Sequence, residues 1–119
     1  MQRFEDIRAW QESRKLTKYV CELTASDRFS EEHELRTQLV RAAISSMTQI
    51  AAGACCDSES EFAHHLARAQ RAVSRLQSLL YTALDLGHIG PDVLRTSYEE
   101  AARTKTLIGD LRAQLERRA

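Results

Sequence analysis

Proline and glycine are scarce in this sequence, with one proline and four glycines spread along 119 residues. Apolar residues make up 43% of the chain and charged residues 29%, and no repeat or low-complexity segment is present. This composition disfavours a disordered chain and a β-sandwich and suits a helical bundle. The length is that of one domain with a real core, so we expect a single domain over residues 1–119.

Cysteine is also sparse, and the three cysteines Cys21, Cys55 and Cys56 show no disulfide-framework spacing. The sequence has no signal peptide pattern and no uncharged stretch long enough to span a bilayer. We therefore expect a cytoplasmic protein in a reducing setting, without a membrane partner.

A net charge of either sign is lacking as well, because 17 basic and 17 acidic residues give a formal charge of zero. A neutral chain has no overall attraction for nucleic acid or membranes. Any argument for such a partner must therefore rest on local patches.

Hydrophobic periodicity predicts four long helices. The first is expected from about Phe4 to Ser26, followed by a short connection under which Phe29 packs. The second follows Ser30 as a candidate N-cap, with Glu31, Glu32 and Glu34 in its first turn, and ends between Gly53 and Cys56. The third follows a Ser58–Glu61 capping box and ends at Gly87, and the fourth starts at Pro91. Long helices with short loops predict an all-α fold, an antiparallel up-down-up-down four-helix bundle.

Each of three helices has one expected core-facing seam. The apolar positions of the first are Ile7, Trp10, Leu16, Tyr19, Val20 and Leu23. Those of the third are Phe62, Leu66, Ala69, Val73, Leu76 and Leu80, and those of the fourth are Leu94, Tyr98, Ala101, Ile108, Leu111 and Leu115. Gly109, inside the fourth helix, is expected to weaken its last turns.

The stretch from Leu35 to Gly53 is apolar over half of its circumference or more, whereas one core needs a stripe only about 100° wide. One stripe holds Leu35, Leu39, Ala42, Ala43, Ser46 and Ile50. The breadth predicts that this helix faces its own core on one side and a subunit interface on the other. The interface residues are predicted to be Leu39, Val40, Ile44, Met47 and Ala51.

The third helix carries a basic ridge, because Arg68, Arg71 and Arg75 recur at three and four residues, opposite the apolar seam. No acidic residue lies between Phe62 and Leu84. Forked guanidinium donors bind phosphate backbones and release counterions, so this ridge, with Arg41, is a candidate nucleic-acid site. The alternatives are a solvated face and an intersubunit ridge paired with acids of a neighbour.

Other constellations are weaker. Glu61 and His64 match the Glu-x-x-His pattern of diiron bundles, but the chain has no second copy of that pattern. Cys55 and Cys56 fit plain small residues better than a metal or redox pair, and His65 fits a packed histidine. No catalytic constellation and no glycine-rich phosphate loop is present, so we expect a non-enzymatic protein without metal or cofactor.

Several motifs, in the same order, resemble those of a known family. They are Phe4-Glu5-Asp6-Ile7 with Trp10, the run Gln38-Leu39-Val40-Arg41-Ala42-Ala43-Ile44-Ser45, Ile50-Ala51 with Gly53, and Leu84-Asp85-Leu86-Gly87. The chain thus resembles the four-helix-bundle proteins encoded in intervening sequences of large-subunit ribosomal RNA genes. That family includes the accessory variability protein of diversity-generating retroelements.

The resemblance implies a ring-like homopentamer and, in the retroelement branch, nucleic-acid binding with a reverse-transcriptase partner. The chain departs from the family pattern at Met47, Gln49 and Ala52, and Arg75 stands where the family usually has Glu. Two hypotheses follow: an oligomeric protein that binds RNA or DNA through Arg41, Arg68, Arg71 and Arg75, or a scaffold that only self-assembles.

Overall fold

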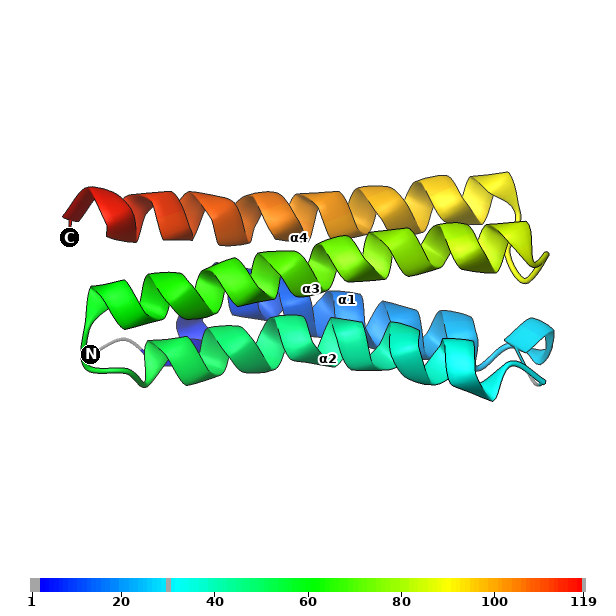
Figure 1. Cartoon of the computed structure of the whole chain (residues 1–119), viewed down its shortest axis with the longest axis horizontal. Coiled ribbons are helices and arrows are strands. Elements are labelled where there is room, and N and C mark those ends of the chain that lie inside the picture. The colour runs from blue at the N-terminus through cyan, green and yellow to red at the C-terminus, as the bar shows by residue number, and fades with distance from the viewer. Residues whose placement is uncertain (1–2, 30, 119) are drawn as a thin grey trace.

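The computed structural model describes residues 3–29 and 31–118 and contains helices only within them (Figure 1). In chain order the elements are η1 (Phe4–Asp6), α1 (Arg8–Thr24), η2 (Asp27–Phe29), α2 (His33–Ala54), α3 (Glu59–Asp85) and α4 (Pro91–Arg118). The predicted all-α fold is confirmed.

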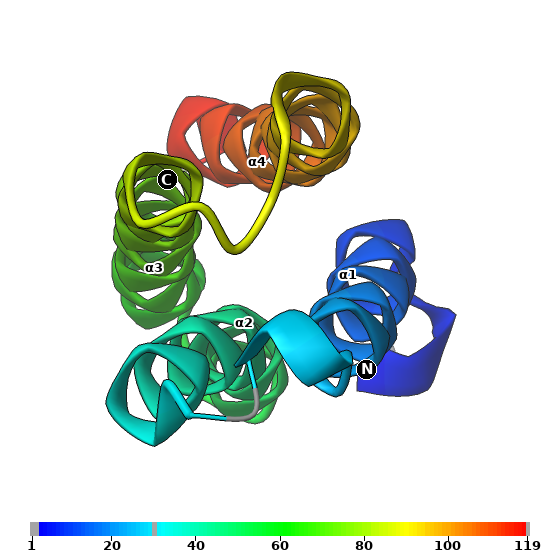
Figure 2. The ribbon, with the colours of Figure 1, turned by 90° about the vertical axis from the view of Figure 1, so that its right-hand side faces the viewer.

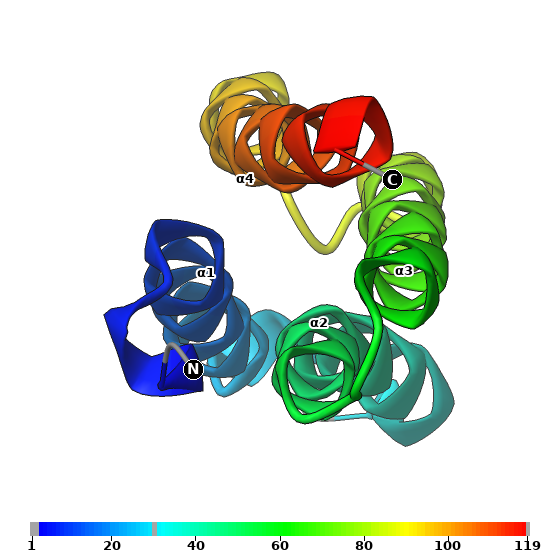
Figure 3. The same ribbon diagram turned by 90° about the vertical axis from the view of Figure 1, so that its left-hand side faces the viewer.

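Each of the four long helices runs antiparallel to the next one along the chain, in a body of 45 × 19 × 19 Å. Seen end-on, they follow one another around the bundle axis in the order α1, α2, α3, α4 (Figures 2 and 3). Each helix packs on the next one along the chain, and α4 closes the bundle against α1. This is the predicted up-down-up-down four-helix bundle. None of the described helices has the length and apolar character needed to cross a membrane.

The core follows the predicted stripes of α2 and α3. On α2 the six stripe residues are all buried, including Ser46, whose Oγ donates to the carbonyl of Ala43 at 2.7 Å. On α3 the seam from Leu66 to Leu80 is buried at every predicted position, and Phe62 is half-buried at its start. Helical periodicity in the sequence therefore located the interior of both helices.

The seam of α4 follows the prediction at Ala101, Ile108 and Leu115 and differs from it at two small hydroxyl residues. The buried positions are Ser97, Ala101, Thr104, Ile108 and Leu115, while Tyr98 lies outside with 37% of its surface exposed. The Ser97 and Thr104 hydroxyls donate to carbonyls of their own helix, at 2.7 and 3.0 Å. A hydroxyl satisfied in this way can be buried at a modest free-energy cost, so hydrophobicity alone misses Ser97 and Thr104.

The first helix also differs, because its start is split in two. Ile7 has an extended backbone (φ −80°, ψ 121°) between η1 and α1, and its side chain is buried. The Gln11 side chain donates to the carbonyl of Glu5 at 2.8 Å and holds the separate turn against the helix. Glu5 and Asp6 suit the first turn of either helix type, so the sequence did not reveal the break. The helix ends at Thr24, two residues earlier than predicted.

The start of the second helix is later than predicted. Glu32 is the N-cap of α2 and makes no side-chain cap hydrogen bond, so Glu34 is the acidic residue of the first turn. The candidate N-cap Ser30 lies outside the described residues. Phe29 is buried under the connection, as predicted.

The remaining turns follow the sequence signals. The Ser58 hydroxyl accepts a hydrogen bond from the backbone N–H of Glu61 at 3.1 Å and caps α3. Gly87 has φ +80°, a left-handed conformation that closes α3. The N–H of His88 donates to the carbonyl of Ala83 and that of Gly87 to Leu84, which is the Schellman pattern. Pro91 is the first residue of α4.

Two glycines inside helices meet the neighbouring helix. A Cβ on Gly53 would lie 2.7 Å from the His65 Cβ and 2.8 Å from a Phe62 ring carbon, so the missing side chain allows α2 and α3 to approach closely. A Cβ on Gly109 would lie 2.8 Å from the Gln70 Nε2, the far end of a flexible side chain. Gly109 therefore makes room for the Gln70 side chain of α3. The sequence predicted only that this glycine weakens α4.

We predict that Gly53→Ala lowers the free energy of unfolding by about 1–2 kcal/mol, because overpacking at the α2–α3 contact exceeds the gain in helix propensity. Thermal unfolding followed by circular dichroism should show the midpoint lowered by roughly 4–8 °C.

The matched control is Gly109→Ala, which makes the same chemical change inside another helix. Here the Gln70 amide can move aside, so the unfolding midpoint should not fall. Equal midpoints for wild type and Gly53→Ala would show that the α2–α3 contact is not tight at this position.

Candidate nucleic-acid interface

The predicted arginine ridge lies on the outer side of α3. Arg68, Arg71 and Arg75 are exposed, as is His64 one turn before them. The opposite side of the same helix is the buried seam, which fixes the direction of the ridge. Helix geometry thus places three guanidinium groups in one line facing solvent.

The structure brings Arg41 of α2 to this ridge. Arg41 and Arg75 line one surface hollow across the α2–α3 pair, together with Gln38, Ala42 and Ser45. Gln38 and Ser45 lie one helical turn before and after Arg41, and neither is among the site residues predicted from the sequence. Their spacing of three and four residues from Arg41 was the signal that could have found them.

Within the described residues, no acidic side chain forms an ion pair with Arg41, Arg68, Arg71 or Arg75. The surrounding sequence explains this, because Leu35–Gly53 and Phe62–Leu84 contain no acid. Four of the five arginines of α4 differ, because each of them forms an ion pair. Their pairs are Arg95–Asp92, Arg103–Glu100, Arg112–Glu116 and Arg118–Glu59.

The neutral chain therefore has a segregated charge. In the α2–α3 hairpin the acids lie only near the helix ends, at Glu31, Glu32 and Glu34 before and in the first turn of α2, at Asp57, Glu59 and Glu61 around the start of α3, and at Asp85 at its end. The middle of the α2–α3 pair is left with arginine alone. A local positive field of this kind attracts a polyanion even when the net charge is zero.

The outer side of α2 also carries the predicted apolar strip. Ile44 is 42% exposed, and Val40, Met47 and Ala51 are half-buried around it. Leu39 is a correction, because it has no exposed surface and belongs to the protomer's own core. Leu39 lies on the buried stripe with Leu35 and Ala42. The sequence predicts it for both the core stripe and the interface, and only the place in the core is correct.

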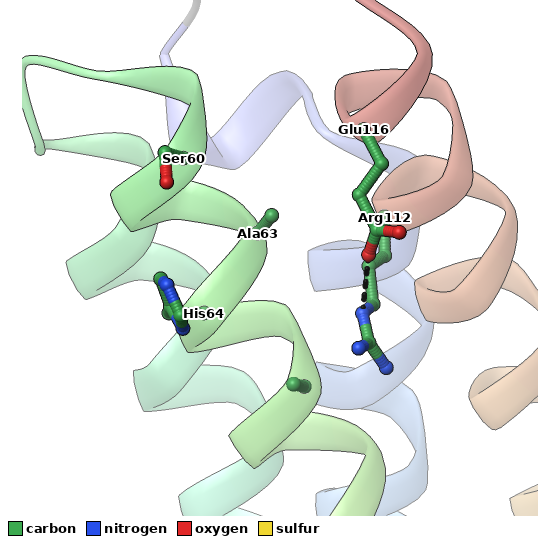
Figure 4. A pocket seen from close by; sticks show the side chains of 6 residues that line it. Ser60, Ala63, His64, Arg112 and Glu116 are labelled. Carbon is green, nitrogen blue, oxygen red and sulfur yellow. Dashed lines mark hydrogen bonds and ion pairs between the residues drawn. The ribbon is translucent and has the colours of Figure 1, made fainter. Parts of the chain in front are cut away.

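A second hollow lies between α3 and α4 (Figure 4). It is lined by Ser60, Ala63, His64, Ala67, Arg112 and Glu116. The Arg112 Nε donates to the Glu116 carboxylate at 2.7 Å, and its Nη1 donates to the Gln70 side chain at 3.0 Å. Arg112 thus fastens α4 to α3, and its charge is compensated in a way that the ridge charges are not.

The weaker constellations have the following geometry. Glu61 and His64 are both exposed, whereas a diiron site needs such side chains in the bundle interior. Among the described residues, no group of three potential metal ligands lies together.

His65 is half-buried, and its Nδ1 lies 2.8 Å from the Gln49 Oε1 across the α2–α3 contact, which is the position of a packed histidine.

The vicinal cysteines lie just after α2. Cys55 is exposed and Cys56 is half-buried, with its Sγ 3.5 Å from the carbonyl of Ala52. Desolvation, together with the nearby Glu61 carboxylate, raises the pKa of the Cys56 thiol. Because the thiolate is the reactive and metal-binding form, this environment disfavours reactivity at Cys56.

The comparisons with known proteins agree with the fold. The family model described as 23S rRNA-intervening sequence protein matches residues 5–110, which include α1, α2, α3 and most of α4. No curated protein matches the chain. The match spans nearly the whole bundle, and the chain therefore belongs to the 23S rRNA-intervening sequence protein family.

Proposed function

We propose that this chain is a non-enzymatic protein that binds the phosphate backbone of RNA or DNA through Arg41, Arg68, Arg71 and Arg75. The observation that carries the proposal is the set of four exposed arginines on α2 and α3, without acidic partners among the described residues. Guanidinium groups that are already exposed and unpaired gain charge-assisted hydrogen bonds to phosphate without first breaking an ion pair.

Self-association is the second part of the proposal. Ile44 is exposed, and the half-buried Val40, Met47 and Ala51 around it complete an apolar strip that a second copy of the chain could cover. Copies joined through this strip, in a ring of the pentameric kind that the resemblance implies, would repeat the arginines several times. Repetition raises the avidity for a long polyanion without any new contact.

A reverse transcriptase is the protein partner that the resemblance to retroelement accessory proteins suggests. A basic oligomer could hold template or primer close to such an enzyme. This role is proposed on the resemblance alone.

A scaffold that self-assembles without nucleic acid is the second candidate. The exposed Ile44 strip favours it directly, since that strip needs an apolar partner and not a phosphate. The two candidates share the oligomer and differ in whether the arginines contact a polyanion or solvent.

We predict that fluorescence anisotropy with duplex DNA and structured RNA shows binding that weakens steeply with salt. Four phosphate contacts correspond to a slope of log K against log salt of about −3.6, or roughly 100-fold weaker binding when salt rises from about 50 to about 200 mM. The Arg68→Glu/Arg71→Glu/Arg75→Glu variant should lose this binding while keeping the wild-type mass by light scattering.

The matched control is Lys18→Glu/Arg95→Glu/Arg103→Glu, which changes the net charge equally but removes cations that lie close to acids of α1 and α4. It should retain most of the affinity. Equal losses in the two variants would mean that only net charge matters, and dissociation of the ridge variant into monomers would make the ridge an interface.

A separate prediction concerns assembly. Ile44→Glu should convert the oligomer to a monomer in light scattering at micromolar concentration, because a charge in an apolar interface is costly to desolvate. The helical circular dichroism signal should not change, since Ile44 is exposed in the protomer. Leu86→Glu, at the exposed α3–α4 turn, is the control and should stay oligomeric. A wild-type protein that is already monomeric would contradict self-association.

A further inference from the structure

Two tyrosines form an exposed aromatic pair on the outside of the α3–α4 hairpin. Tyr81 is 50% exposed and Tyr98 37%, and their ring centroids lie 5.9 Å apart at an interplanar angle of 71°. The other five aromatic side chains of the chain are buried or half-buried. An edge-to-face pair occupies only part of its ring surface, so ring faces remain available to a third aromatic group.

The pair is held by packed helices and not by a loop. On α3 the neighbouring Leu80 belongs to the core, and on α4 Ser97 does, so both tyrosines lie just off the seam. Gln77 is buried one turn before Tyr81, and its Nε2 donates to the backbone carbonyl of Tyr98 at 3.5 Å. A platform fixed in this way loses little conformational entropy when a ligand stacks on it.

Tyr81 lies on the same row of α3 as one of the ridge arginines. Arg71, Ser74, Ser78 and Tyr81 are spaced by three, four and three residues, which places them along one line of the helix surface. At a rise of 1.5 Å per residue the row from Arg71 to Tyr81 spans about 15 Å, a length of a few nucleotides. The serines between them are short and leave the line unobstructed.

The facing row of α4 adds a cation. Tyr98, Ala102 and Lys105 follow one another at four and three residues on that helix. On α3, the acidic residue Asp85 lies one turn beyond Tyr81, so the positive charge lies on the Arg71 side of the tyrosine pair. Aromatic faces at one end and cations further along are what single-stranded nucleic-acid sites combine, since bases stack while the backbone follows the positive charge.

We propose that Tyr81 and Tyr98 stack on unpaired bases of a nucleic-acid strand whose phosphates contact Arg71 and Lys105, so that the preferred ligand is single-stranded. This inference rests on the nucleic-acid binding proposed above and names its substrate class. In a duplex the base faces are buried in the stack, so the tyrosines contribute to binding of the single strand and not of the duplex.

The test compares Tyr81→Ala/Tyr98→Ala with the wild type, using a fluorescein-labelled single-stranded RNA and the same sequence annealed as a duplex. Affinity for the single strand should fall roughly 10- to 100-fold, the range expected for the loss of base stacking. Affinity for the duplex should change by less than about twofold. The Tyr81→Phe/Tyr98→Phe variant keeps the ring faces and should bind the single strand like the wild type.

The outcomes separate the two proposals. Unchanged single-strand binding in the alanine variant, with binding lost in Arg71→Glu/Arg75→Glu, would overturn the stacking inference and leave the proposed function standing. Equal losses for single strand and duplex would also overturn it, because the tyrosines would then serve folding, assembly or a protein contact. Failure of the wild type to bind either probe at low salt would overturn both proposals.

Discussion

The close approach of α2 and α3 is the constraint on which the other features depend. Gly53 lies against the side chains of Phe62 and His65, and the Gln49–His65 hydrogen bond crosses the same contact. Because two helices packed this tightly present their outer faces side by side, Arg41 of one and Arg75 of the other line a single hollow. The candidate interface is therefore a property of the helix pair and not of either helix alone.

Small and hydroxyl-bearing seam residues allow this packing along much of the bundle. Ser46, Ser97 and Thr104 are buried, and each hydroxyl is satisfied by a carbonyl of its own helix. Seams built in this way need no polar partner from a neighbouring helix. Tyr81 and Tyr98 lie just off these seams, next to the buried Leu80 and Ser97, so their rings stay on the surface.

The sequence predicted most of the fold because local signals agreed with it. Caps and turn residues at Ser58, Gly87 and Pro91 set the ends of α3 and the start of α4, and the family match supports the same bundle. It failed where a signal was ambiguous: acids at the chain start suit a 3₁₀ turn as well as an α-helix. The site was predicted only in part, because the hollow that joins two helices depends on their packing distance.

The order in which the helices pack favours rapid folding of the chain. Every helix contacts its successor, so most of the core joins segments that are near in sequence, and the closure of α4 against α1 is the one step that brings the chain ends together. Low contact order of this kind is associated with folding in microseconds to milliseconds. The hairpins of α2 with α3 and of α3 with α4 can form before that closure, so the arginine surface can be assembled early and the α1–α4 seam last.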